Sequence, residues 1–187
     1  GSPVPLPFSW WYLWIMRILG IDPGLQKTGW GIIEAEDNRL GFITCGIIKT
    51  DSDLTLPERL AQIDVGMQEV LAAWKPAEVA IEETFMNTNA SSSLKLQCAR
   101  GVAMVVPARS GLPVHEYAPN LVKKSVVGNG HATKDQVEMM VRTLIPSVGR
   151  ALGADEADAI AIAICHAHHA TSRTRFGDIM ARVAHDR

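Results

Sequence analysis

Two carboxylate side chains follow apolar segments that are typical of buried strands. Asp22 ends the run 17–22 (RILGID), directly before a Pro-Gly turn signal, and Glu82 follows the apolar residues 79–81 (VAI). An Asp before Pro-Gly is commonly a turn residue. A carboxylate at the end of a central strand is costly to bury without a partner, so Glu82 is harder to explain structurally. If the two strands are neighbours, both acids lie at one edge of a sheet.

A second pair of acids opens the last strong helical segment, which is rich in Ala and Ile and spans residues 155–170. Asp155 and Asp158 are three residues apart and therefore share one helical face. Acids at a helix start commonly serve as caps or interact with the helix dipole. Together with the two strand-end acids, however, they form a set of four carboxylates that repel one another unless cations neutralise them. Because Mg²⁺ takes oxygen ligands, the joint pattern favours a magnesium site.

The elements that must position these acids follow from apolar periodicity and turn signals. The strands are expected at 17–22, 28–36, 40–50, 78–83 and 113–117, the first three joined by short turns as an antiparallel meander. The helices are expected at 60–74, from a cap at 89–93 to about Pro107, and at 120–127, 134–144 and 155–170. This order predicts an α/β fold with a mixed five-stranded sheet and helices on both faces.

The length of 187 residues, with 47% hydrophobic residues, suits one well-buried domain. We expect the domain to span residues 16–172. Residues 1–15, which hold three of the five Trp, are expected to be a leader or an appended segment, and the polar, Arg-bearing residues 173–187 a flexible tail. The seven-residue apolar run SWWYLWI is far shorter than the roughly 20 residues of a membrane span, so no membrane association is expected.

The cysteines and histidines are not spaced as a metal or disulfide framework. Cys45, Cys98 and Cys165 are far apart and lack any CxxC pair, which argues against both zinc and disulfides and favours a cytoplasmic protein. The histidines are expected to be structural or solvated, because no Cys or acid completes a zinc set with them. A minor alternative places His166, two helical turns beyond Asp158, close behind the acids. These histidines are His115, His131, His166, His168 and His169.

Four longer runs resemble the RuvC family of bacterial Holliday-junction resolvases. They are ILGIDPGLQKTGWGII (18–33), VAIEETFMNTNASSSLKLQCARG (79–101), VKKSVVGNGHATKDQV (122–137) and DEADAIAIAICH (155–166). The match extends in order from Met16 to about His169. It implies a ribonuclease-H-like fold, a homodimer, and Mg²⁺-dependent paired nicking of four-way DNA junctions, with Mn²⁺ able to substitute. It also implies RuvA and RuvB as branch-migration partners.

The same resemblance assigns the four acids as catalytic metal ligands. The family's first acid falls on Asp22, its second on Glu82, and its last pair on Asp155 and Asp158, although some relatives use His at the position of Asp155. Two ions about 4 Å apart can activate a water on one side of the scissile phosphate and stabilise the leaving 3′ oxygen on the other. The implied products are 5′-phosphate and 3′-hydroxyl ends that a ligase can seal.

Three further residues match DNA-contacting positions of the family. Phe85 falls where the family stacks an aromatic ring on an unpaired base, an interaction worth about 1–3 kcal/mol per base. Its structural alternative is a core residue at a strand end. Lys123 and Lys134 match lysines that contact the scissile region, whereas by themselves they would be regarded as solvated surface residues.

Charge is unevenly distributed along the chain, which carries a net charge of −2. Residues 1–83 hold 6 basic and 12 acidic residues, whereas residues 84–154 hold 8 basic and 3 acidic residues. A basic segment beside a metal-filled acidic site is compatible with DNA binding that is modest and salt-sensitive.

Three other functions are compatible with parts of the sequence. The Asp-Pro-Gly start also resembles the phosphate hairpin of actin-like kinases, which need about twice this length. A module that only binds junctions would have lost one or more of the acids. The main alternative is a different nuclease of the same fold, acting on RNA or on RNA–DNA hybrids.

Overall fold

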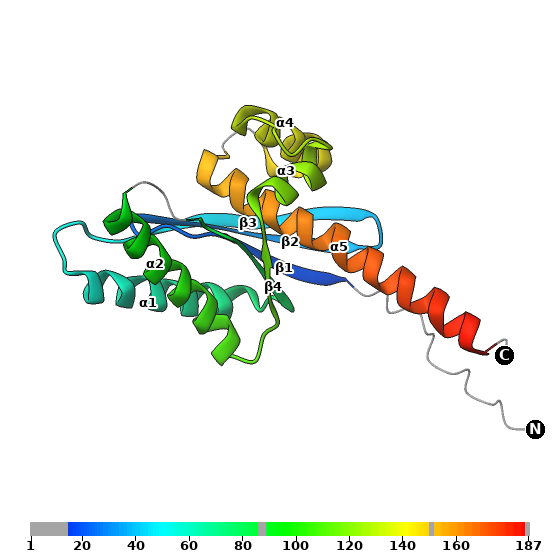
Figure 1. Cartoon of the computed structure of the whole chain (residues 1–187), viewed down its shortest axis with the longest axis horizontal. Helices are drawn as coiled ribbons and strands as arrows, with labels where there is room; N and C mark the ends of the chain where they lie inside the picture. Colours follow the sequence, from blue (N-terminus) through cyan, green and yellow to red (C-terminus); the bar gives the residue numbers. More distant parts are fainter. Residues whose placement is uncertain (1–14, 86–88, 150–151, 186–187) are drawn as a thin grey trace, which may run out of the picture.

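A mixed five-stranded sheet lies at the centre of the molecule, with helices on both of its faces (Figure 1). The computed structural model describes residues 15–85, 89–149 and 152–185, with side chains described as far as residue 170. The strands are β1 (Met16–Asp22), β2 (Lys27–Glu36), β3 (Arg39–Lys49), β4 (Glu78–Glu82) and β5 (Val114–Tyr117). The helices are α1 (Leu56–Trp74), α2 (Ala90–Arg109), α3 (Pro119–Val127), α4 (Lys134–Leu144) and α5 (Ala154–His185), with a 3₁₀ turn at Pro146–Val148.

The strand order in the sheet is β3-β2-β1-β4-β5. β1, β2 and β3 pair antiparallel, as the short turns predicted, whereas β4 pairs parallel to β1 and β5 pairs parallel to β4. The parallel pairs are possible because α1 and α2 return the chain to the same end of the sheet. The predicted fold class is therefore confirmed, and β1 and β4 are neighbours.

Successive residues of β1 point to opposite faces and enter two separate cores. Ile18 packs beneath α3, α4 and α5, whereas Leu19 and Ile21 pack beneath α1 and α2. All three side chains are fully buried. Because both faces are covered, the central strands read as continuous apolar runs rather than alternating ones.

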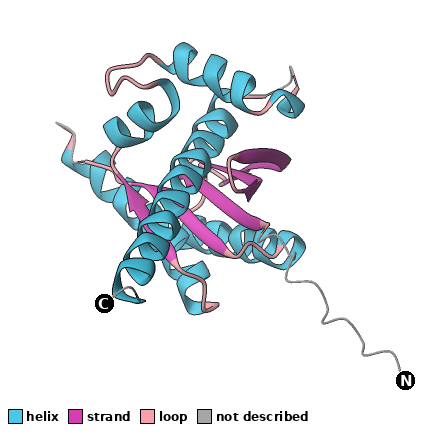
Figure 2. Ribbon diagram, turned by 90° about the vertical axis from the view of Figure 1, so that its right-hand side faces the viewer, coloured by secondary structure: helices cyan, strands magenta, loops and turns pink. Residues whose placement is uncertain are grey.

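The long helix α5 runs across the sheet (Figure 2), and small residues let it lie very close to β1 and β2. A Cβ added at Gly20 would stand 2.0 Å from the carbonyl oxygen of Ala159, and one at Gly29 would stand 2.4 Å from that of Asp155. Any side chain at Gly20 or Gly29 would therefore displace the helix. The glycines thus set how near the first turns of α5 come to the end of β1.

Some boundaries differ from those expected. α2 continues through Pro107 to Arg109, because a proline in the last turn of a helix removes only one hydrogen bond. α5 extends to His185 rather than ending near residue 170, in a segment that contains no proline to stop it. Apart from Ile15, which is exposed, the expected leader 1–15 lies outside the described residues. Across the described residues, no helix is both long enough and apolar enough to cross a membrane.

Candidate active site

Asp22 and Glu82 lie side by side at one edge of the sheet. They are the last residues of the adjacent parallel strands β1 and β4, whose pairing ends with Ile21 opposite Ile81. Parallel neighbours end at the same edge, which is why residues sixty positions apart meet there. The sequence predicted this juxtaposition on the condition that the two strands are neighbours, and the strand order meets that condition.

The first turns of α5 bring the other two acids to the same place. Asp155 and Asp158 are partly buried, and both raise the pKa of Asp22 by charge repulsion. Their helix crosses β1 and β2 at the glycines described above, with its N-terminus at this edge. The positive end of the helix dipole partly offsets the local negative charge. The structure thus brings the other three predicted acids into electrostatic range of Asp22.

Burial and mutual repulsion make two of these carboxyls unusually weak acids. Burial is the largest cause that raises the pKa of Asp22 to about 7, followed by the charges of Glu82 and Asp158. The pKa of Glu82 also rises to about 7, through burial and then the charge of Asp158. An all-oxygen cluster that resists ionisation in this way fits a divalent cation, which would neutralise it. The residues present are therefore a suitable donor set for Mg²⁺.

Both predicted lysines border the acids. Lys134 donates a hydrogen bond of 2.9 Å from its Nζ to Oδ2 of Asp158, and this bond raises the pKa of the ammonium group. Lys123, on α3, lies near enough to lower the pKa of Glu82 by its charge. Lys134 is the first residue of α4, whose start is fixed by a capping box between Thr133 and Gln136. Sequence patterns without the family resemblance would not have selected these two lysines.

Phe85 is a surface residue, so the structural alternative of a core phenylalanine is wrong. It follows Glu82 by three residues, after the end of β4, and its side chain is 65% exposed. A large aromatic ring left in solvent beside an acid cluster is unusual, because burial of a phenylalanine contributes about 1.5–3 kcal/mol. The ring is therefore accessible to a ligand that approaches the acids.

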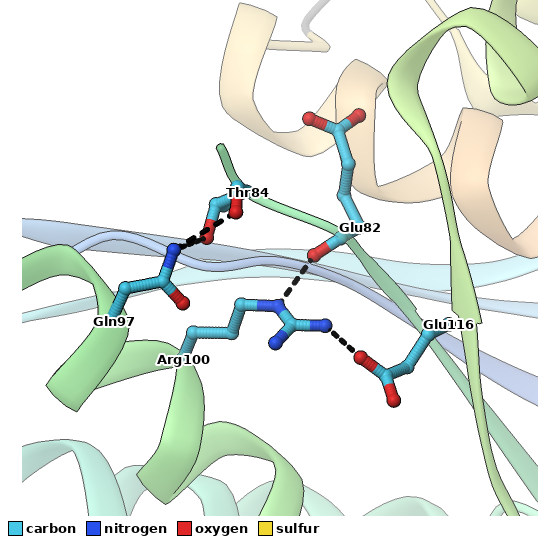
Figure 3. Close-up of polar contacts among 5 residues, drawn as sticks. All are labelled: Glu82, Thr84, Gln97, Arg100 and Glu116. Carbon is cyan, nitrogen blue, oxygen red and sulfur yellow. Dashed lines mark hydrogen bonds and ion pairs between the residues drawn. The ribbon is translucent and has the colours of Figure 1, made fainter. Parts of the chain in front are cut away.

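Two side chains of α2, which the sequence did not single out, hold the end of β4 (Figure 3). Arg100 donates from Nε to the backbone carbonyl of Glu82 at 3.0 Å and forms an ion pair with Glu116. Gln97 donates from Nε2 to both the carbonyl and the hydroxyl of Thr84, at 2.9 and 2.8 Å. The Glu82 carboxylate points away from Arg100, so the arginine positions the backbone without pairing with the acid (Figure 3).

The expectation that no acid completes a histidine set is wrong. Glu78, at the start of β4, lies against both His115 and His166, with Oε2 3.1 and 2.7 Å from their Nε2 atoms. No sequence spacing linked the three residues, because they come from β4, β5 and α5. His166 also bonds Tyr117, so it belongs to this separate cluster rather than standing behind the four acids.

Comparison with known proteins agrees with this geometry. Residues 18–166 match the family model described as crossover junction endodeoxyribonuclease RuvC. A relative of the same name from Paramagnetospirillum magneticum is 56% identical over 167 residues, which is 89% of this chain and all of the relative. This chain belongs to the RuvC family. The matched segment includes all seven site residues predicted from the sequence.

Solved structures support the same assignment. RuvC from Thermus thermophilus, in a complex described as containing a Holliday junction substrate, superposes with a TM-score of 0.78 at 32% identity, covering 85% of this chain and 97% of that one. The yeast mitochondrial Holliday junction resolvase Ydc2 superposes with a TM-score of 0.61 at 13% identity, covering 82% and 78%. The second match shows the fold alone, and the RuvC fold of this chain is the ribonuclease-H-like architecture that was expected.

Proposed function

We propose that this protein is a Holliday-junction resolvase that cuts four-way DNA junctions by paired, symmetric nicks, in recombination and repair. The observation that carries the proposal is the cluster of Asp22, Glu82, Asp155 and Asp158 at one sheet edge of a RuvC-family fold. The names of the relatives and the junction-bound relative support the same substrate class.

Asp22, Glu82, Asp155 and Asp158 are the proposed metal-binding and catalytic residues. They would hold Mg²⁺, or Mn²⁺ in its place, because carboxylate oxygens are the ligands these hard cations prefer. When bound, such ions supply an activated water and stabilise the leaving oxygen of the phosphodiester. The protein's part is to keep four partly buried carboxylates converged, which the close contact of α5 with β1 achieves. We expect 5′-phosphate and 3′-hydroxyl products.

Lys123, Lys134 and Phe85 are the proposed DNA contacts. The two lysines lie next to the acids and carry positive charge to the place where a scissile phosphate would bind. Lys134 bonds Asp158 in the free protein, so DNA and cation binding would exchange that bond for phosphate contacts. The exposed ring of Phe85 is available to stack on a base that is unpaired at the crossover.

Two symmetric nicks require two active sites related by a two-fold axis, so we propose a homodimer. Branch-migration proteins of the RuvA and RuvB type are the proposed partners, on the strength of family membership. We also propose that the protein works in the cytoplasm, where its three free cysteines would remain reduced.

The decisive experiment is cleavage of a synthetic mobile four-way junction by the full chain. We expect symmetric nicks with Mg²⁺ and none with a chelator. Asp22→Asn and Glu82→Gln should each lower the cleavage rate by at least about 1,000-fold, because each removes a charge that the cations need. Both variants should retain junction binding in a gel-shift assay.

The alternative nuclease gives a different result in the same assay. Comparable cutting of an RNA–DNA hybrid, with the four-way junction left intact, would contradict the resolvase proposal. Matched linear duplexes of the same sequence serve as the control for structure specificity, and they should remain uncut at enzyme concentrations that resolve the junction.

A further inference from the structure

A second polar cluster lies on the same face of the sheet as the four acids, at the other end of β4. Glu78 is the first residue of this strand and Glu82 is the last, a separation of roughly 13 Å. His166 follows Asp158 by eight residues on α5, or about 12 Å along the helix. The strand and the helix thus carry one polar cluster at each end, with the buried apolar residues Ala80 and Ile162 in the core between the two elements.

Three side chains of this second cluster point at one another. Oε2 of Glu78 lies 3.1 Å from Nε2 of His115 and 2.7 Å from Nε2 of His166, and all three atoms lie within 4.8 Å of one another. The imidazole rings of the two histidines lie 4.5 Å apart at a tilt of 31°. Two imidazole nitrogens and one carboxylate oxygen that converge from three different elements are a ligand set suited to Zn²⁺.

One nitrogen of the cluster makes no hydrogen bond of normal geometry. Nε2 of His115 is shielded from solvent, although the side chain is 31% exposed, and its contact of 3.1 Å with Oε2 of Glu78 lacks the geometry of a hydrogen bond. Buried polar atoms nearly always make a well-aligned hydrogen bond, so a nitrogen that has only a poorly aligned contact with a carboxylate needs an explanation. A metal ion between the three atoms would replace the bond of 2.7 Å between Nε2 of His166 and Oε2 of Glu78 and give Nε2 of His115 a partner as well.

Tyr117 orients His166 by a hydrogen bond to its second ring nitrogen, as neighbouring polar groups orient metal-binding histidines in other proteins. Its hydroxyl lies 2.7 Å from Nδ1 of His166, and because a hydroxyl both donates and accepts, it tolerates the proton on either ring nitrogen. With the proton on Nδ1, the lone pair of Nε2 faces Glu78 and His115. His166 is fully buried, whereas Glu78 is 27% exposed, so one side of the cluster opens to solvent.

We propose that Glu78, His115 and His166 form a binding site for Zn²⁺ or a similar borderline-soft divalent cation, with water as the fourth ligand. Tetrahedral bonds of the usual length place zinc ligands about 3.3 Å apart. The oxygen–nitrogen separations of 3.1 and 2.7 Å would therefore widen by about 0.2 and about 0.6 Å, and the two nitrogens, which lie within 4.8 Å, would take the same spacing. The site differs in kind from the acid cluster, because imidazole selects zinc over magnesium. Zinc would join β4, β5 and α5 and fix the register between the strand that ends in Glu82 and the helix that begins near Asp155.

The test is zinc binding by the full chain after metal removal, measured by competition with a chromogenic chelator and independently of DNA cleavage. We expect the wild type to bind one zinc ion at this site. Glu78→Gln and His115→Phe should each bind it at least 100-fold more weakly than the wild type. Tyr117→Phe should weaken binding about tenfold, the usual effect of losing an orienting partner. His131→Phe, a matched change at an exposed histidine outside the cluster, should bind as the wild type does.

Two further measurements separate this site from the acids. Co²⁺ in place of zinc should give the intense visible bands of a four-coordinate site, which Asp22→Asn keeps and Glu78→Gln loses. Saturating zinc should raise the Tm of the wild type by about 5 °C and leave that of Glu78→Gln unchanged.

Two results would overturn the proposal. One is equal zinc affinity in the wild type, Glu78→Gln and His115→Phe, and the other is a cobalt spectrum with only weak six-coordinate bands. Either would show that the cluster is a hydrogen-bonded network without metal. If His115→Phe fails to fold by circular dichroism, the isosteric Glu78→Gln decides the question.

Discussion

The individual carboxylates of the acid cluster are held in a state that opposes their own ionisation. The pKa of Asp22 and that of Glu82 both rise to about 7, first through burial and then through neighbouring negative charge. Lys134 and Lys123 offset only part of this repulsion. The cluster therefore lowers the free energy of unfolding of the metal-free protein, and binding of a cation would restore it.

These raised pKa values predict how stability depends on pH. A carboxyl whose pKa is higher in the folded than in the unfolded state stabilises the fold at low pH, and that contribution is lost as the pH rises through about 7. In the presence of a chelator we expect the wild type to lose about 1 kcal/mol per carboxyl between pH 6 and 8 relative to an Asp22→Asn, Glu82→Gln double variant. Thermal unfolding of both proteins across this range measures the difference, and Mg²⁺ should abolish it. Parallel pH profiles would contradict the assignment.

The exposed position of Phe85 predicts that its removal impairs junction cleavage more than junction binding. Its exposed ring is expected to contribute most when the crossover opens and a base becomes unpaired. Phe85→Ala should therefore lower the rate of junction cleavage by about tenfold or more while changing the junction Kd only a few-fold. Single-turnover cleavage and gel shifts with the same junction provide both values. Val105→Ala, at an exposed apolar residue of α2, is a control for loss of surface apolar area. Equal loss of binding and cleavage in Phe85→Ala would contradict a stacking role.

At the scale of elements, the site depends on how closely one helix approaches two strands. α5 lies on β1 and β2 because glycine stands at the points of contact, and α2 fixes the end of β4 through Arg100 and Gln97. The four acids thus belong to three elements whose spacing is set by residues that never touch a cation. Substitutions at those residues should weaken cation binding at the four acids without removing any ligand.

Gly20→Ala tests this dependence. The new methyl group would stand 2.0 Å from the carbonyl oxygen of Ala159, so α5 must move away from β1. We expect a loss of about 2–3 kcal/mol in the free energy of unfolding. The affinity for Mn²⁺ should also fall, measured by calorimetry. Gly41→Ala, in β3, is the matched control, because its added Cβ would meet only one atom, at 4.0 Å. Equal losses of stability and of Mn²⁺ affinity in the two variants would show that the close approach of α5 to β1 does not determine the geometry of the site.

At the scale of the whole molecule, the distribution of charge and the proposed two-fold symmetry bear on how the protein acts on a junction. The net charge is only −2, but the segment that supplies Lys123 and Lys134 is basic, whereas the first 83 residues are acidic. Junction binding should therefore rely on a local positive face and weaken steeply with salt. A proposed two-fold axis would present two such faces to the two strands that are cut.

The proposed dimer predicts the behaviour of mixed subunits. When the wild type is mixed with an excess of Asp22→Asn, most active dimers contain one competent site, so the products should shift from resolved duplexes to singly nicked junctions. Sedimentation velocity of the wild type should show a dimer at the concentrations used for cleavage. A monomer that still makes paired nicks at full rate would contradict the proposal.

The sequence by itself determined much of this protein, because its signals are local. Apolar runs, turn residues and caps predicted the strands and most of the helices, and the motifs around Asp22, Glu82 and Asp155 identified the family and the four acids. Local patterns did not predict that α5 continues beyond residue 170, because the polar, Arg-bearing composition of the segment resembles that of a tail although no proline interrupts it.

Only the tertiary structure decided which distant residues meet. The parallel pairing of β1 with β4 placed Asp22 beside Glu82, and the glycine contacts set the approach of α5. The structure also revealed the roles of Arg100 and Gln97, and it overturned the expectation for the histidines by bringing Glu78 to His115 and His166. Their positions lie as much as 88 residues apart, and no spacing rule connects residues that meet through sheet order and helix packing.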